Sequence, residues 1–292
     1  MAMRRRPCAR AHGGLALIAV LWIVAALSLM VTGLTATVRQ QIQTAAVQRD
    51  QVSGQALGEA AIALALQQLQ LAAQRPRGVV SDTVSYAGVQ IEVELARLDG
   101  LIPLNGASPE LLAALLRFAG GLAPAEAEAL ARTMVEWRDG RPELSLTESA
   151  AARAAARRFE APEDLLLVPG VDYALYARVA PLVSADLGAT ARVNPLAAPP
   201  GVLAVLAQGN AGQVAQYLSQ RAGGEPGADA SGFQPAFVGG GGGELYRLRA
   251  RVPLEEGKML HLTRDVALSV SASRTAPWRI LRTDRQIVAS PG

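Results

Sequence analysis

The feature that most constrains this chain is a long apolar segment close to its N-terminus. Arginines precede it, and no charged residue occurs from Gly13 to Val38, after which Arg39 follows. A transmembrane helix needs about 20 apolar residues, which residues 15–31 and their weaker continuation supply, and the basic flank predicts a cytoplasmic N-terminus. A secretory signal peptide has a shorter apolar core of about 7–15 residues. The segment therefore predicts an anchor, a discarded leader, or a leader and an anchor divided by cleavage before the apolar run.

The sequence after this segment predicts that the helix continues beyond the bilayer. No proline occurs between residues 39 and 74, and Gln, Ala and Leu, which tolerate helix, dominate there. Apolar residues recur at helical spacing from Leu57 to Ala65, and Pro76 ends the pattern. We expect one helix over residues 15–75, roughly 90 Å long at 1.5 Å per residue, lipid-soluble at first and amphipathic afterwards.

Composition favours helices and gives little evidence of a nucleic-acid partner. Half of the 292 residues are apolar, 18% are charged and 4% are aromatic, which favours Ala- and Leu-rich helices over a β-sandwich. The net charge is +3, but four of the 28 basic residues lie in the first 14 without an acid, so 24 remain against 25 acidic residues. The basicity therefore belongs largely to the N-terminal flank. The single cysteine, Cys8, provides no disulfide framework.

Strand patterns flank a central helical block. Between Val89 and Leu95 apolar and polar residues alternate, which predicts a half-buried strand with residues 84–88 as its hairpin partner. The alternation returns near the C-terminus in ELYRLRARVPL, MLHLTRDVALSV and PWRILRTDRQIV. We therefore expect an α+β fold in which a helical domain is inserted between strands of one antiparallel sheet.

Prolines mark helix starts in the block between residues 101 and 222. Ser108 and Pro109 form a helix N-terminus, with Ser as the N-cap and Pro at the first position. Pro124 opens another helix, which runs to Trp137. Further short helices are expected to begin near Glu148, Pro162, Asp172 and Asn210.

Two segments of this block resemble each other. LNGASPELLAALL (104–116) and VNPLAAPPGVLAVL (193–206) each place an Asn ahead of a Pro-initiated, Leu-rich helix. An Asn side chain can hold such a turn by bonding its own backbone, so Asn105 and Asn194 are expected to be structural. The segment that follows, residues 223–243, is rich in glycine and is expected to be a mobile linker with too few apolar side chains to pack.

A DNA-binding helix-hairpin-helix module is the main alternative function. Residues 165–179, LLLVPGVDYALYARV, look like its turn, and residues 104–116 resemble the entry to such modules in competence-type DNA-binding proteins. Phosphate binding needs approachable N–H groups and basic side chains. Asp172 instead places a negative charge where that family usually has a second Gly, and residues 101–222 hold 10 basic and 12 acidic residues. We therefore interpret the hairpin as a packing device and expect no nucleic-acid partner.

The chain shows little sign of catalysis. No G-x-S-x-G, HExxH, Walker A or Rossmann glycine pattern is present. Of the two histidines, His12 lies in the N-terminal flank and His261 alternates within a strand pattern. We therefore expect neither an enzyme nor a cofactor.

One acidic turn could hold calcium. Glu136, Asp139 and Glu143 could offer some of the six to eight oxygen ligands that Ca²⁺ takes. Arg138 and Arg141 lie in the same turn and can pair with these acids. A solvated turn is therefore the favoured interpretation.

The start of the chain resembles a type IV prepilin leader. In such a leader a membrane peptidase cuts after a Gly between the basic flank and the apolar helix, and the new N-terminus is methylated. Gly13 and Gly14 occupy this place, so the resemblance implies cleavage between Gly14 and Leu15. The alternative is a flexible hinge before an uncut anchor. Most pilins and pseudopilins carry Glu at mature position 5, where this chain has Ala19.

Over essentially its whole length the chain resembles the type II secretion minor pseudopilin K family of the general secretion pathway. The segments that carry the resemblance are GGLALIAVLWIVAALSLM, RLDGLIPLNGASPELLAALL, VEWRD, FEAPEDLLLVPGVDYALYARVAPLV and ARVNPLAAPPGVLAVL. Ala19 agrees with it, because the K subunit is the family member that lacks the Glu. The resemblance implies a pilin-like fold, with a long N-terminal helix packed on an antiparallel sheet and a large all-α (helix-hairpin-helix/SAM-like) insertion between strands. It also implies calcium on the helical domain, although residues 140–142 replace the acids expected after WRD.

The resemblance further implies a place in an assembly. The protein would sit in the inner membrane as a single-pass protein with a cytoplasmic N-terminus and a periplasmic C-terminal domain. At the tip of the pseudopilus it would assemble with minor pseudopilins I and J, whose filament exports folded proteins across the outer membrane. Its other partners would be the major pseudopilin, the prepilin peptidase, the inner-membrane secretion platform and membrane lipid.

Six segments are expected along the chain. They are a leader (1–14), the transmembrane and amphipathic helix (15–75), the first part of the sheet (76–100), the inserted helical domain (101–222), a Gly-rich linker (223–243) and the second part of the sheet (244–292).

Overall fold

The computed structural model describes most of the chain as two compact units. The described residues are 13–139, 158–188, 190–222, 228–240, 243–268 and 277–289. One unit ends at Gly54 and the other begins at Gln55. The N-terminal helix α1, Gly13–Leu71, belongs to both, and all strands belong to the second unit. Residues 1–12 of the expected leader (1–14) and the helix start expected near Glu148 lie outside the described residues.

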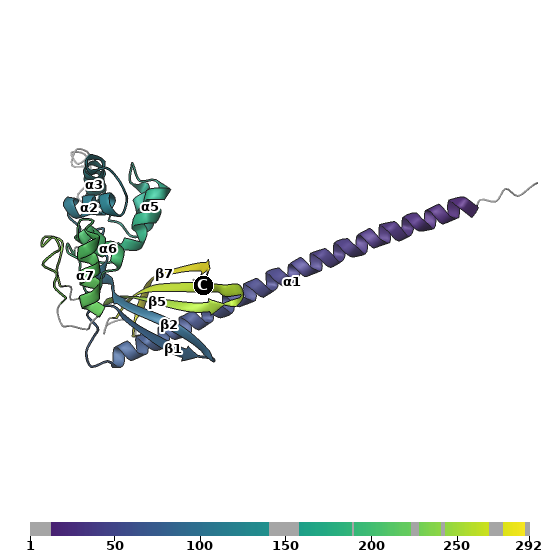
Figure 1. The fold of residues 1–292 in the computed structure, drawn as a ribbon, viewed down its shortest axis with the longest axis horizontal. Coiled ribbons are helices and arrows are strands. Elements are labelled where there is room, and N and C mark those ends of the chain that lie inside the picture. Colours follow the sequence, from purple (N-terminus) through teal and green to yellow (C-terminus); the bar gives the residue numbers. More distant parts are fainter. Residues whose placement is uncertain are drawn as a thin grey trace, which may run out of the picture. The chain divides into compact units, whose positions relative to one another are not determined.

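A five-stranded antiparallel sheet forms the first layer of the second unit (Figure 1). Its order is β1-β2-β5-β6-β7, with bounds β1 Val80–Tyr86, β2 Val89–Arg97, β5 Leu245–Leu254, β6 Lys258–Ala267 and β7 Arg279–Ala289. The hairpin expected between the first two strands is confirmed. Its two-residue turn, Ala87 and Gly88, has φ of 51° and 80°, the positive values that a type I′ hairpin turn requires.

The last turns of α1 pack on one face of this sheet. On α1 the buried side chains are Ala61, Ile62, Leu66 and Leu69. Buried residues on the strands alternate with exposed or half-buried ones, as in β5, where Tyr246, Leu248, Ala250 and Val252 point into the core. This alternation is the period-2 pattern of a sheet with one buried face. The expected helix-on-sheet arrangement of an α+β fold is therefore present.

A glycine sets how closely helix and sheet approach. Gly58 is buried on α1, and a Cβ placed on it would lie 3.1 Å from Leu262 Cδ2 and 3.2 Å from Val252 Cγ2. Both distances are shorter than ordinary van der Waals contact, so the absence of a side chain allows the two layers to meet at this point. Glycine normally weakens a helix by roughly 1 kcal/mol relative to alanine. At position 58 this loss comes with close packing of the helix on the sheet.

A helical region lies between two neighbouring strands of the sheet. Because β2 pairs directly with β5, everything from Leu98 to Glu244 is inserted between adjacent strands. Its elements are η1 Leu98–Gly100, β3 Ile102–Pro103, α2 Pro109–Phe118, α3 Pro124–Asp139, η3 Pro162–Leu167, α5 Tyr173–Val179, η4 Ala180–Leu182, β4 Val183–Ser184, α6 Pro200–Leu206 and α7 Ala211–Ala222. The short strands β3 and β4 pair in parallel, and η5, Glu255–Gly257, joins β5 to β6.

Local sequence explains where these helices begin. Ser108 caps α2, with its Oγ accepting a hydrogen bond from the Leu111 N–H at 3.3 Å, and Pro109 follows at the first helical position. Asp172 caps α5 by accepting from the Leu175 N–H at 2.7 Å. Both caps satisfy N–H groups that a helix start leaves unpaired. The expected helix starts near Ser108, Pro124, Pro162, Asp172 and Asn210 are thus confirmed.

The expectation that residues 223–243 cannot pack is wrong for their described part, 228–240. Phe233 and Phe237 are 3% and 4% exposed and belong to the core of the helical region. The Val193 N–H donates to Phe237 O at 2.8 Å, and the Gly239 N–H donates to Val193 O at 3.0 Å. Two large aromatic side chains supply enough apolar surface to anchor this segment, whatever its glycine content.

Gly58 provides a test of the helix–sheet contact. A leucine at Gly58 would overlap Leu262 and Val252, so Gly58→Leu is expected to lower the free energy of unfolding by about 2 kcal/mol. Ala56→Leu, on an exposed position of the same helix, is the control and should change it by less than about 0.5 kcal/mol. The measurement is denaturant unfolding of the full chain in detergent. Equal stability of the two variants would contradict the close contact.

Candidate functional site

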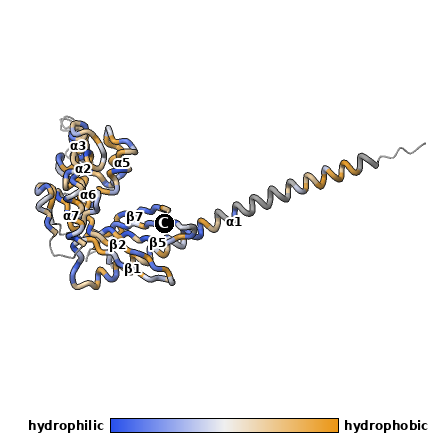
Figure 2. Tube along the Cα trace, viewed as in Figure 1, coloured by the Kyte–Doolittle hydropathy of each residue, from blue (hydrophilic) through white to orange (hydrophobic). Residues whose placement is uncertain are grey.

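Residues 17–30 of α1, in the N-terminal unit, expose many large apolar side chains. The exposed large side chains of this stretch are Leu17, Ile18, Val20, Leu21, Trp22, Ile23, Val24, Leu27 and Met30, each between 56% and 75% exposed. Figure 2 shows this part of α1 coloured as hydrophobic. A helix that is apolar on all sides is one that other apolar matter covers. Within the described residues, however, no helix meets the criteria of length and apolarity for a membrane span.

The three residues expected at the processing site all lie in α1. Gly14 and Leu15 belong to its first turn, and Ala19 follows one turn later with an exposed side chain. The location of these residues in α1 does not test cleavage, methylation or the place of the chain in a filament. They stay predictions.

A buried polar junction connects the helical region to the sheet. Asp99, in η1 at the end of β2, is 5% exposed. One carboxylate oxygen, Oδ2, accepts from Arg97 Nε at 3.1 Å and lies 3.0 Å from an Arg97 terminal nitrogen, while Oδ1 accepts from Asn194 Nδ2 at 3.1 Å. The Asn194 N–H donates to Asp99 O at 2.9 Å. Both ends of this acid are therefore satisfied, as a buried charge requires.

The same junction reaches the C-terminal end of the insertion and the segment between α1 and β1. Arg97 also donates to Gly243 O at 2.8 Å, immediately before β5, and Asn194 Nδ2 lies 3.3 Å from Arg77 O, between α1 and β1. Four stretches that are far apart in sequence thus meet around Asp99. We call this set of Arg97, Asp99 and Asn194 the junction.

Close backbone packing and an arginine hold the other side of the junction. A Cβ on Gly100 would lie 2.2 Å from Ala197 O, so only glycine allows the chain to pass there. Arg221, on α7, donates to Ala198 O at 2.7 Å, and burial lowers the pKa of its guanidinium. Asn194 also accepts from the Leu196 N–H at 3.1 Å. The local turn bond expected for Asn194 is therefore confirmed, together with distant bonds that its turn pattern does not reveal.

Asn105 is also structural, but in a different way from that expected. Its Nδ2 donates to Phe159 O at 2.8 Å and to Ala185 O at 2.9 Å, and its Oδ1 accepts from the Phe159 N–H at 2.9 Å. No bond of its side chain to its own turn is present among the described contacts. The Phe159 ring stacks on Trp137 with centroids 4.6 Å apart. Asn105 therefore connects distant segments of the helical region rather than closing its own turn.

At the C-terminal end of α3, the acid Asp139 pairs with an arginine. Arg138 Nε donates to Asp139 Oδ1 at 2.8 Å, as expected for a turn in which the arginines neutralise the acids. Arg138 also donates to Ala107 O at 2.9 Å, which ties the end of α3 to the start of α2. Glu143 and Arg141 lie outside the described residues. Among the described residues no group of three or more His, Cys, Asp or Glu is arranged to hold a metal.

The hairpin expected as a DNA-binding alternative has an acid committed to its own helix. The loop between η3 and α5 turns at Gly170, with φ of 94°, and Asp172 then caps α5 as described above. Its carboxylate accepts from the Leu175 N–H, one of the helix-start N–H groups that a phosphate would need. The loop geometry is thus that of a capped helix start, with no basic side chain among Val168 to Asp172.

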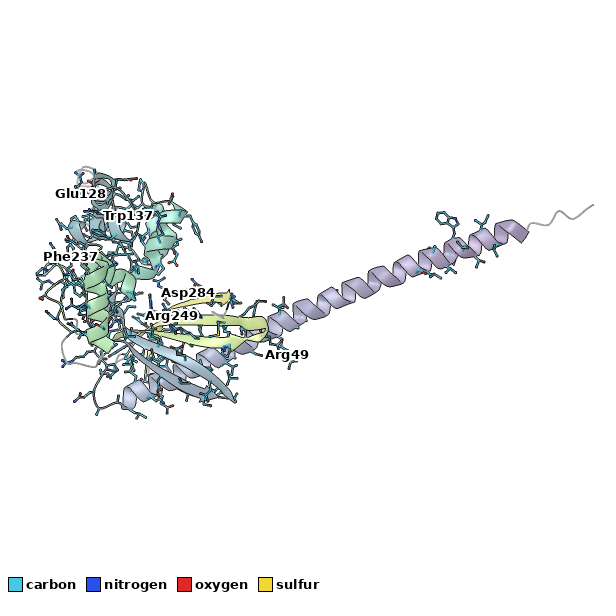
Figure 3. All side chains as sticks on the ribbon, in the orientation of Figure 1. Arg49, Glu128, Trp137, Phe237, Arg249 and Asp284 are labelled. Carbon is cyan, nitrogen blue, oxygen red and sulfur yellow. The ribbon has the colours of Figure 1, made fainter. Side chains whose placement is uncertain are left out.

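A groove lies between α5 and the outer face of the sheet. Its volume is about 470 Å³, and its floor comes from β5, β6 and β7, where Figure 3 labels Arg249 and Asp284. Its wall comes from the η3–α5 segment, including Tyr173 and Tyr176. His261, expected in a sheet, is on β6 in this floor. Burial and the nearby Arg251 and Arg249 lower the pKa of its imidazole.

The comparisons with known proteins concern the helical region first. Residues 103–186 match the family model described as "Type II secretion system (T2SS), protein K". This part of the chain, within the helical region, is similar to the type II secretion system protein K family. The matched residues run from β3 to the segment after β4 and contain α2, α3, η3 and α5.

Two other comparisons complete this result. No curated protein matches the chain. A chain of the crystal structure of the GspK–GspI–GspJ complex from the enterotoxigenic Escherichia coli type 2 secretion system is 18% identical, with 86% of this chain and 99% of that chain covered and a TM-score of 0.47. That similarity is too low to support an argument about the fold.

Sequence reasoning identified Asn194 as structural but missed its partners in the junction. Arg97, Asp99 and Arg221 were not expected to carry any role. The signal that could have found Asp99 is its place directly after a strand and before a glycine, in RLDG, because an acid that ends a strand is well placed to meet the turns of an insertion.

Asp99 provides a test of the junction. Asp99→Ala leaves the Arg97 guanidinium and the Asn194 amide without their buried acceptor. The free energy of unfolding of the full chain should therefore fall by about 3 kcal/mol. Asp82→Ala is the matched control, since Asp82 is exposed on β1 and accepts only from the adjacent Thr83 N–H. It should change stability by less than about 0.5 kcal/mol. A loss of similar size in both variants would contradict the role given to Asp99.

Proposed function

We propose that this chain is the minor pseudopilin at the tip of a type II secretion pseudopilus. The observation that carries the proposal is the match of residues 103–186 to the protein K family, in a helical region inserted between two neighbouring strands. In this proposal the fold is a pilin-like one, with α1 and the sheet as its pilin part and the helix-hairpin-helix/SAM-like region as its insertion. Mechanism here means assembly rather than catalysis.

The N-terminal half of α1 anchors the chain in the inner membrane in this proposal. Its exposed apolar side chains, from Leu17 to Met30, need an apolar environment, and the acyl chains of lipid provide one. The arginines before Gly13 hold the N-terminus in the cytoplasm, which leaves the second unit in the periplasm. The prepilin peptidase then removes residues 1–14 and methylates Leu15.

The filament tip is the position that fits Ala19. In pilins the Glu at mature position 5 pairs with the N-terminal amine of a neighbour inside the lipid, where an unpaired charge is costly. With Ala19 at that position, this chain carries no such charge and needs no neighbour ahead of it. The bulk of the helical region adds to this, because a subunit with a large insertion leaves little room for another above it.

The partners proposed for the tip are minor pseudopilins I and J. The match of residues 103–186 to the protein K family model, together with the resemblance of the whole sequence to minor pseudopilin K, makes these subunits the partners to test for this chain. Their N-terminal helices would pack side by side along α1. The major pseudopilin and the inner-membrane platform would join below. No observation favours the DNA-binding alternative, and we do not propose it.

Cleavage at Gly14 tests the anchor and leader together. Gly14→Val places a branched side chain at the residue after which the peptidase cuts, so the protein extracted from membranes should keep its leader. Intact mass and N-terminal sequencing measure this. The wild-type chain should begin at a methylated Leu15 only when the prepilin peptidase is present.

Gly13→Ala is the control for that variant. It changes the neighbouring glycine by one methyl group and should leave cleavage after Gly14 intact. An intact Met1 in the wild-type chain, or a cut beyond Ala25, would contradict the pseudopilin proposal.

A further inference from the structure

The helical region and the sheet have separate hydrophobic cores. The buried apolar residues of the helical region form one cluster, which runs in sequence from Leu98 to Phe237. Those of the sheet and the last turns of α1 form another, from Ala61 to Leu268. Among the described residues, no buried one belongs to both clusters. Each part is therefore stabilised by its own core, and the contacts between the parts decide the angle between them.

The junction is the buried attachment between the two parts. Asp99, which is 5% exposed, bonds Asn194 of the helical region. Gly100 passes so close to Ala197 that no side chain fits between them. Leu245, at the start of β5, packs against the core of the helical region. Breaking a buried and fully bonded charge is strongly unfavourable, so this attachment is firm.

A second attachment is made from β7 and is partly exposed to solvent. Arg282 donates to Glu160 O at 3.1 Å, and its terminal nitrogens lie 3.5 Å from a carboxylate oxygen of Glu163 and of Asp186. The side chain of Glu163 is 61% exposed. Exposed ion pairs at such a distance are weak, and salt screens them. We call Arg282 and these three partners the latch.

The strand register explains why Arg282 bonds the helical region. Asp265 on β6 lies opposite both Arg247 and Arg282. Both of its carboxylate oxygens accept from Arg247, at 2.7 and 2.8 Å, and Asp265 is 2% exposed. Because this acid is already satisfied within the sheet, the donors of Arg282 are directed to the helical region instead.

The sheet places the latch well away from the junction. In the sheet order, β7 is the third strand from β2, which leads into the junction. Neighbouring strands lie about 4.8 Å apart, so roughly 14 Å of sheet separates the two attachments. The groove of about 470 Å³ lies between α5 and the outer face of β5, β6 and β7. A rotation about the junction therefore moves α5 away from β7 and widens this groove.

We propose that Arg282 is a salt-sensitive latch, and that the helical region turns about the junction when the latch opens. A body with one firm and one weak attachment moves by a hinge rotation. In the closed form, the η3–α5 segment lies over the outer face of the sheet. In the open form, groove residues such as Tyr176 and His261 become accessible. A partner that binds only one form shifts the ratio of the two. This inference concerns the second unit alone and does not depend on the proposed function.

Distances between spin labels measure this rotation. Cys8, the single cysteine of the sequence, is replaced in Cys8→Ser, and two cysteines are introduced into the full chain in detergent. The reporting pair is Arg178→Cys on α5 with Thr283→Cys on β7. The reference pair is Arg178→Cys with Arg132→Cys on α3, and all three positions are exposed. The reporting pair is expected to show a short and a longer distance, and the reference pair a single one.

Salt and one substitution then act on the latch itself. Raising the salt from about 0.1 M to about 1 M shortens the Debye length from about 10 Å to about 3 Å, so the share of the longer distance should rise severalfold. Arg282→Gln should raise the ratio of open to closed form roughly tenfold at the lower salt, through the loss of two exposed pairs and a hydrogen bond. Salt should have little further effect on that variant.

The matched control is Arg279→Gln, which removes an exposed arginine from the same strand. It should leave both the distances and their dependence on salt unchanged. Glu163→Gln is a milder change at an exposed position and should act like Arg282→Gln with a smaller effect. Unfolding midpoints show whether each variant is folded, and the salt series on the unchanged latch tests the proposal even if Arg282→Gln is not.

Three results would overturn the latch. The first is a reporting distance that neither salt nor any folded latch variant changes. The second is an effect of Arg279→Gln as large as that of Arg282→Gln. The third is a reference distance that changes together with the reporting distance, because the helical region would then deform instead of turning about the junction.

Discussion

The buried carboxylate of Asp99 is the interaction on which the arrangement of the second unit depends. An insertion between two paired strands must leave the sheet and return to it at almost the same place, and the chain between them must not pull the strands apart. At that place Asp99 accepts from Arg97 and Asn194, and Arg97 in turn bonds the residue that leads into β5. A buried acid is tolerated only when such partners surround it. The junction therefore lets a large helical region be added to a sheet that keeps its own register.

The account of an assembly subunit follows from surfaces rather than from a catalytic centre. Residues 17–30 of α1 expose large apolar side chains, the last turns of α1 pack on the sheet, and the sheet ends in a strand without a buried side chain. Each of these exposed features is costly or idle in an isolated chain. Together these features suit a subunit with one helix in an apolar layer and with neighbours beside its sheet.

Much of the secondary structure could be predicted from the sequence, because strand alternation and helix starts depend on residues that are close together in the chain. The alternation in residues 89–95 and 245–252 specified strands with one buried face, and Ser108 with Pro109 specified a helix start. The packing of Phe233 and Phe237 was missed, because glycine content was judged without the aromatic side chains in between. The bonds of Asn105 to Phe159 and of Asp99 to Asn194 cross 54 and 95 residues. Spacing along a chain carries no information about contacts of that kind.

The central claim is that this chain occupies one end of a pseudopilus, and its position in the filament tests that claim most directly. The chain would be tagged at its C-terminus, and filaments assembled with the major pseudopilin and minor pseudopilins I and J would be labelled with gold and viewed by electron microscopy. The account predicts a single label at one end of each filament. Labels distributed along the filament, or filaments of normal number and length without any label, would contradict it.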